Sequence, residues 1–154
     1  MKTRWIVLKK WIALLSAVFL GEMLVCTACT NDSYPEKIPL EYSVCAKTSL
    51  PGELQDIIND KQKKAFEITY STDSFLYIAV GYGMMNKDNL RVVVNDFYQT
   101  EEAIYIETGL YTKEYLQDAK EKASDAGEPS LFPYIVVKCE KNNKPVVFKV
   151  SYNR

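Results

Sequence analysis

The stretch Phe75-Leu-Tyr-Ile-Ala-Val80 is a run of six apolar residues rich in aromatic and branched side chains. A short run of this kind predicts a buried β-strand. It follows a turn-forming segment at Ser71-Thr-Asp-Ser74, and before that turn Phe66-Glu-Ile-Thr-Tyr70 alternates apolar and polar residues, which predicts a second strand. After it, the segment Gly81–Asn89 predicts a loop whose two glycines let the chain turn. The centre of the chain is therefore expected to be β-rich.

Further strands are expected on both sides of this centre. Strand-forming residues are found at Leu40–Ala46, Leu90–Tyr98, Ala103–Thr108, Tyr134–Lys138 and Val146–Val150. The last two flank Lys141-Asn-Asn-Lys144, which predicts a hairpin turn between them.

Two helices are also expected. The first runs from Pro51 to about Lys64, with Leu54, Ile57 and Ile58 on one face, a spacing typical of a helix that packs on a sheet. The second, at Lys113–Asp125, has only a thin apolar stripe and predicts a surface excursion. The whole pattern predicts an α+β fold of about seven mostly antiparallel strands, with one packed helix and one surface excursion helix.

The first 28 residues differ from the rest of the chain. Lys2, Arg4, Lys9 and Lys10 give a positive start, and Trp11–Leu20 is continuously apolar. This order is typical of a secretory signal. A membrane-spanning helix is the first alternative, but Glu22 would be costly within it. A buried core helix is the second, but it leaves the positive cluster unexplained.

The end of this segment, Thr27-Ala28-Cys29, resembles the lipobox of bacterial lipoproteins, in which the cysteine is lipidated and becomes the mature N-terminus. Cys26 occupies the place where a leucine is usual. The resemblance implies lipidation at Cys29, for example with palmitate. Residues 1–28 are then the lipoprotein signal peptide, 29–37 a polar tether and 38–154 a single domain, held on the extracytoplasmic face of a bacterial membrane in the cell envelope.

The amino-acid composition excludes several classes of function. The 154 residues include 19 Lys and Arg, 20 Asp and Glu, and no histidine. The absence of histidine excludes Ser-His-Asp and Cys-His catalysis and His-ligated metal sites. Residues 1–28 hold 4 of the basic and 1 of the acidic residues, so 15 basic and 19 acidic residues remain, a charge of −4. A mildly acidic domain is not expected to bind nucleic acid.

Cysteines and carboxylates supply the remaining candidate chemistry. Cys45 and Cys139 lie on predicted strands and form a candidate disulfide, the alternative being two separate buried thiols. Carboxylates could in principle serve a two-carboxylate glycosidase. A solvated acidic surface is the simpler interpretation of these residues, which are Glu101, Glu102, Glu107, Glu114, Asp118 and Glu121. We expect no catalytic residue, no metal and no cofactor.

Tyrosine is the compositional excess. All 11 tyrosines follow Cys29, and tyrosine is enriched both in binding surfaces and in strands. We expect partner contacts from the loop Gly81–Asn89 and the excursion Thr112–Phe132. The residues singled out as contacts are Tyr82, Met84, Met85 and Tyr111.

The order of elements from Phe75 to Val150 resembles the PrcB C-terminal domain family. The best-fitting segment is Phe132-Pro133-Tyr134-Ile-Val-Val-Lys138, which is similar to a Pro-Tyr-x-x-Val strand of that family. The family's Thr-Gly-Gly-Tyr segment is missing, and Gly81-Tyr82-Gly83 stands in its place. The resemblance implies a small secreted protein or lipoprotein, and a surface protease complex as a partner.

These observations predict a non-catalytic accessory lipoprotein that presents an α+β domain to a protein partner. One alternative is a cell-wall glycan hydrolase that uses carboxylates. The other is a structural spacer without a ligand.

Overall fold

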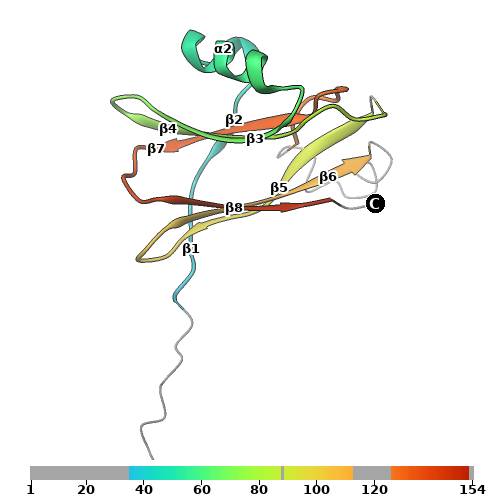
Figure 1. Ribbon diagram of the computed structural model, residues 1–154. Helices are drawn as coiled ribbons and strands as arrows, with labels where there is room; N and C mark the ends of the chain where they lie inside the picture. The colour runs from blue at the N-terminus through green and yellow to red at the C-terminus, as the bar shows by residue number, and fades with distance from the viewer. Residues whose placement is uncertain (1–34, 88, 113–125, 153–154) are drawn as a thin grey trace, which may run out of the picture. The chain divides into compact units, whose positions relative to one another are not determined.

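Strands dominate the part of the chain that a computed structural model describes, which is residues 35–87, 89–112 and 126–152. Eight strands form two four-stranded sheets, and one α-helix lies on the outer face of one sheet (Figure 1). The mixed α+β class predicted from the sequence is confirmed, with eight strands in place of about seven. Within these ranges, no helix is both long and apolar enough to span a membrane.

The two sheets are named here by their central strands. The β5–β6 sheet has the order β1 (Ile38–Pro39), β5 (Leu90–Gln99), β6 (Ile104–Thr112), β8 (Val146–Ser151). The β4–β7 sheet has the order β2 (Ser43–Val44), β7 (Tyr134–Glu140), β4 (Phe75–Tyr82), β3 (Ala65–Ser71). Every neighbouring pair is antiparallel except β6 and β8, which run parallel.

Strand β4 is buried on both faces, which explains its unbroken apolar sequence. Leu76, Ile78 and Val80 face the core between the two sheets. Tyr77 and Ala79 alternate with them and face a second core on the other side of the sheet. The strand is thus the shared wall of two hydrophobic cores.

Helix α2 (Gly52–Lys61) closes the second core. Leu54 and Ile58, one turn apart, are fully buried and pack with Phe66, Tyr77 and Val136 of the β4–β7 sheet. The predicted packed helix is confirmed, although it ends at Lys61, before the expected Lys64. A short 3₁₀ turn at residues 47–49 leads into it.

Of the strand expected at Leu40–Ala46, only Ser43–Val44 forms a strand, β2, and the preceding β1 (Ile38–Pro39) belongs to the other sheet. Leu40 and Tyr42 lie between them and pack against the core between the sheets. The Tyr42 ring meets Phe97 edge-on, with 5.1 Å between the ring centroids. The alternating apolar residues therefore line the core while the chain crosses from one sheet to the other.

The hairpin expected at Lys141–Lys144 is wrong, because β7 and β8 lie in opposite sheets. Lys141 donates its N–H to the Ser74 carbonyl in the β3–β4 turn, whereas the Pro145 carbonyl accepts from the Ile104 N–H of the other sheet. Both strands carry an apolar row, and the two rows face the same core from opposite sides. This connection is a crossover between sheets.

The surface excursion helix expected at Lys113–Asp125 lies outside the described residues. The chain is described again from Ala126, which forms an isolated antiparallel bridge with Val93 of β5. Gly127 then donates its N–H to the Val92 carbonyl over 2.8 Å.

The loop expected from Gly81 begins two residues later, because β4 continues through Tyr82. Tyr82 is only 3% exposed and faces the core between the sheets. Its hydroxyl lies 3.1 Å from Thr108 Oγ1 and donates to the Ser151 carbonyl at 3.2 Å. The chain turns at Gly83, where φ is +75°. The prediction of Tyr82 as a surface contact is therefore wrong.

Replacing Tyr82 tests this placement. Tyr82→Phe should lower the free energy of unfolding by about 1 kcal/mol through loss of the hydroxyl hydrogen bonds. Tyr82→Ala should cost about 3–5 kcal/mol, because it also leaves a cavity. Urea unfolding measures both values. The control Tyr152→Phe changes an exposed tyrosine and should stay within about 0.5 kcal/mol of the native chain. Equal small effects at both positions would contradict the burial of Tyr82.

The same residue predicts a dependence on alkaline pH. Burial raises the pKa of Tyr82 to about 12, above the value of about 10 in an unfolded chain. The Tyr82 hydroxyl therefore keeps its proton to a higher pH in the folded state than in the unfolded state. Its contribution to the free energy of unfolding is fully present below pH 10 and is lost as the pH rises toward 12. Unfolding free energies between pH 9 and 11 should fall less steeply for Tyr82→Phe than for the native chain.

Candidate functional site

The described domain has two distinct ends along the strand direction. The chain enters beside the C-terminal end of β5, where Ile38 pairs with Gln99. The segment after Gly83 leads instead to Leu90, at the N-terminal end of the same strand. These positions are about 30 Å apart along β5 at the usual rise of an extended chain. The first strand and the β4–β5 connection are therefore well separated (Figure 1).

Two segments meet at the end far from the chain entry. We call the surface formed by residues 83–87, 89–91 and 126–133 the loop surface. Backbone hydrogen bonds join its parts: the Met85 N–H donates to the Leu131 carbonyl at 2.8 Å, and the Ser130 N–H to the Leu90 carbonyl at 3.4 Å. The Met84 N–H donates to the Lys63 carbonyl beyond α2 at 3.3 Å. The segments are thus fixed to one another.

Two exposed apolar side chains mark the loop surface. Met84 is 68% exposed and Leu131 is 48% exposed, and the hydrogen bond from the Met85 N–H brings their backbones together. Met85 is half-buried and packs against the core between the sheets. Of the two methionines predicted as contacts, Met84 is therefore the one that is available to a partner.

Arg91 and Asn89 add polar groups to the loop surface. Arg91 Nε and Asn89 Oδ1 are buried from water and have no hydrogen-bond partner within the described residues. A buried polar atom without a partner costs free energy that a bound group of matching chemistry can recover. Asn89 lies in the predicted contact loop Gly81–Asn89, whereas the sequence did not single out Arg91, because an arginine near the start of a strand has the pattern of an ordinary exposed side chain.

Tyr111, another predicted contact, lies beside the loop surface on the outer face of the β5–β6 sheet. It pairs with Arg91 in the register of β5 and β6. Its hydroxyl donates to Asn95 Oδ1 at 2.9 Å, and its ring covers Gly109 so closely that a Cβ there would be 2.7 Å from a ring carbon. Tyr111 is thus half-buried and held in place.

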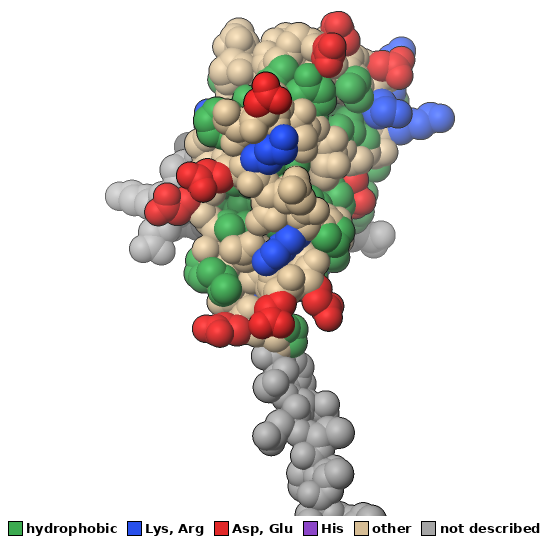
Figure 2. Space-filling model, turned by 90° about the vertical axis from the view of Figure 1, so that its left-hand side faces the viewer, with side chains coloured by type: hydrophobic (Ala, Val, Ile, Leu, Met, Phe, Trp, Pro, Cys, Tyr) green, Lys and Arg blue, Asp and Glu red, His purple; other side chains and the backbone are tan. Residues whose placement is uncertain are grey.

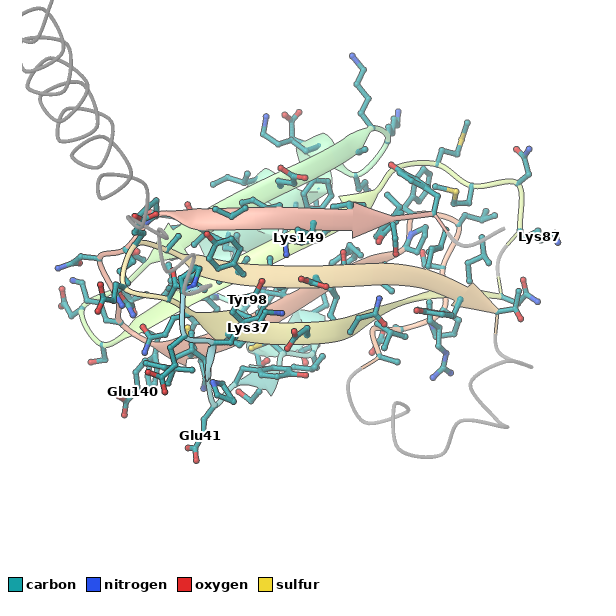
Figure 3. All side chains as sticks on the ribbon, turned by 90° about the horizontal axis from the view of Figure 1, so that it is seen from below. Lys37, Glu41, Lys87, Tyr98, Glu140 and Lys149 are labelled. Carbon is teal, nitrogen blue, oxygen red and sulfur yellow. The ribbon has the colours of Figure 1, made fainter. Side chains whose placement is uncertain are left out.

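The remaining part of that outer face carries a cluster that the sequence did not predict. Tyr98 is only 4% exposed and stacks on Tyr105, with 5.0 Å between the ring centroids. Lys37 Nζ lies 4.1 Å from the Tyr98 ring centroid, and Lys149 Nζ donates to the Tyr98 hydroxyl at 3.0 Å. In Figure 3 these three labelled residues lie close together on this sheet. Tyr105 and Lys149 of the sheet and Lys37 of the entering chain therefore cover Tyr98.

Glu107 belongs to the same cluster. Lys149 Nζ donates to Glu107 Oε1 at 2.6 Å. This bond lowers the pKa of Glu107 and raises the pKa of Lys149. Glu107 is therefore held ionised, which does not suit a general acid of a glycosidase.

The other carboxylates considered for hydrolysis are not grouped in a described hollow. Glu101 and Glu102 are exposed in the β5–β6 turn, and Glu114, Asp118 and Glu121 lie outside the described residues. Figure 2, which looks at the end of the sandwich with the β5–β6 turn, shows acidic side chains spread over the surface. Glu41 and Glu140 do line a hollow of about 350 Å³, but in Figure 3 both point away from the domain.

A smaller hollow of about 230 Å³ lies behind the loop surface. Its lining includes Cys45, Glu128 and the half-buried Tyr134. Burial raises the pKa of both Cys45 and Tyr134, so neither group is an activated nucleophile. Within the described ranges, no group of three or more Cys, Asp or Glu residues is arranged to hold a metal ion.

Cys45 and Cys139 are free thiols on opposite faces of the β4–β7 sheet. Cys45 packs with the core under α2, and Cys139 packs with the core between the sheets. The Cys45 N–H donates to the Val136 carbonyl, three residues from Cys139 along β7. An odd separation along a strand places side chains on opposite faces, so the candidate disulfide is not formed in this structure.

Thiol labelling tests this arrangement. In the folded protein, iodoacetamide should modify the half-buried Cys45 more than about tenfold faster than Cys139, because a buried thiol reacts only after local unfolding. In urea without a reductant, both should be labelled fully. Peptide mass spectrometry measures the extent at each site. Protection of both cysteines in urea until a reductant is added would show a disulfide instead.

Comparison of the chain with protein-family models, with curated proteins and with solved structures found no match in any of the three. The fold defines the domain as a two-sheet β-sandwich with a helix on one outer face. Its function must be inferred from its own residues.

Proposed function

We propose that this protein is a non-catalytic accessory lipoprotein of the cell envelope that binds a protein partner through its loop surface. The observation that carries the proposal is the pair of exposed apolar side chains, Met84 and Leu131, on segments joined by backbone hydrogen bonds. Exposed apolar side chains on a fixed framework are typical of contacts with a partner. The flexible thioether of Met84 suits such a contact.

Arg91 supports the same surface. Its Nε is buried and lacks a hydrogen-bond acceptor among the described residues, so an acceptor from a partner would satisfy it once the side chain turns outward. The resemblance to the PrcB C-terminal domain family makes a surface protease complex one candidate for that partner.

The position of the loop surface also fits a tethered protein. The chain enters the domain at β1, and the loop surface lies at the other end of β5. A lipid at Cys29 would be joined to β1 by a polar segment of a few residues. The loop surface is thus at the end of the domain opposite the point where the chain enters β1.

The partner contact is tested by photo-crosslinking in native cells. A photoactivatable residue at position 84 or 131 should capture the same protein. The same residue at position 38 should not capture it, although Ile38 is 47% exposed. Met84→Ser combined with Leu131→Ser should reduce recovery of that protein at least about tenfold, as expected when central apolar contacts are removed.

Ile38→Ser is the matched control and should leave recovery unchanged. Circular dichroism should show that all variants stay folded. Equal capture from position 38, or full recovery with the double variant, would contradict the assignment of the loop surface.

Lipid anchoring is tested by growth with labelled palmitate. The native chain should incorporate the label and fractionate with membranes, and Cys29→Ser should lose both properties because its acylation site is gone. Cys26→Ser is the control and should keep the label. Persistent labelling of Cys29→Ser would disprove the lipobox.

A further inference from the structure

The two sheets have four edges, and these edges differ in length. Strands β1 and β2 are edges of two residues each, whereas β3 has seven and β8 has six. Unpaired N–H and C=O groups along a long edge can pair with another strand. In the described part of the chain, β8 pairs only with β6 (Figure 1).

Strand β3 carries its own protection against pairing. Glu67, Thr69 and Ser71 lie opposite Val80, Ile78 and Leu76, whose side chains face the core between the sheets. The polar row of β3 therefore points inward at an open flank, where these residues remain exposed. An inward-pointing charge such as Glu67 is a recognised feature that prevents the edge of a sheet from pairing with another chain.

Strand β8 has no inward-pointing charge. Its inward row, Val146, Phe148 and Val150, is apolar and packs against the core between the sheets, yet it is only half-buried. Its outward row starts with Val147, which is 37% exposed. The one charge on the strand, Lys149, is already bound to Glu107 at 2.6 Å. No proline or bulge interrupts the pairing with β6.

The flank beside β8 is also not filled by the described chain. A hollow of about 360 Å³ lies between the two long edges, lined by Phe66 and Glu67 from the side of β3 and by Val150 and Tyr152 from the side of β8. Tyr152, which follows β8, is 59% exposed. Among the described residues, the flank beside β8 is therefore open.

We infer that β8 pairs with β8 of a second copy of this chain, antiparallel and about a two-fold axis at Phe148. Opposite residues of an antiparallel pair point to the same face, so the apolar row matches itself only in registers centred on a residue. Centring on Phe148 aligns five residues: Phe148 meets Phe148, Val146 meets Val150, and Val147 meets Lys149 of the second copy.

Charge and the length of the pairing select this register over its neighbours. Centring on Lys149 would place the two lysines directly opposite each other, and like charges in that position destabilise a pair. Centring on Val147 would align only three residues of the strand, Val146 to Phe148, instead of five. The register at Phe148 has neither fault. The two β5–β6 sheets then form one continuous sheet across an isologous interface.

Two substitutions at Val147 that introduce charges of opposite sign test the inference, because they should change the dissociation constant in opposite directions. Val147→Glu places a carboxylate opposite Lys149 of the second copy and should tighten the dimer about three- to tenfold. Val147→Lys places two ammonium groups together and should weaken it by a similar factor. Analytical ultracentrifugation of the full chain in a mild detergent, over a range of concentrations, measures the dissociation constants.

Asn59→Glu and Asn59→Lys are the matched controls, since they introduce the same charges at an exposed position of α2, away from the flank that holds β8. Neither should alter the dissociation constant. A chain that stays monomeric at every concentration would overturn the inference. A dimer that responds equally to both changes at Val147, or that responds to the changes at Asn59, would overturn it as well.

Cysteine crosslinking tests the register separately. In membranes from cells that co-express Val147→Cys and Lys149→Cys chains, mild oxidation should join the two different chains. Each variant expressed alone should crosslink less. Stronger crosslinking of Lys149→Cys alone, or of Val147→Cys alone, would show that another register is used and would overturn the pairing centred on Phe148.

Discussion

Burial of β4 on both faces is the constraint on which the rest of the structure depends. One row of its side chains, including Ile78, forms the core between the sheets, and the alternate row, including Tyr77, forms the core under α2. Both cores lose a wall if this strand is displaced. A strand buried on both faces must be apolar throughout, which is why the deciding stretch of sequence does not alternate.

The two outer faces of the sandwich are covered in different ways. Helix α2 covers the β4–β7 sheet through Leu54 and Ile58. On the β5–β6 sheet, in the described residues, long side chains of the sheet and of the entering chain cover Tyr98. Aliphatic stems of lysine can shield an aromatic ring while the ammonium group stays in water.

The two proposed interaction surfaces are built from different physical features and lie on different parts of the domain. The loop surface has exposed apolar side chains at the end of the sandwich and a guanidinium nitrogen that finds no acceptor among the described residues. Strand β8 pairs only with β6 in the described part of the chain, which leaves the backbone groups along its other side unpaired there. Side-chain contacts are specific to a partner, whereas backbone pairing needs only a strand of matching pattern. One surface can therefore be occupied while the other stays free.

Local sequence determined where most elements lie, because periodic burial is written into neighbouring residues. Residues 66–70, 75–80, 90–98, 134–138 and 146–150 were predicted as strands and lie within observed strands. Tertiary structure alone decided which strands pair. It separated β7 from β8, turned Tyr82 inward and placed Cys45 and Cys139 on opposite faces. These outcomes depend on which apolar rows meet across the core, and that matching involves residues far apart in the chain, which no local pattern records.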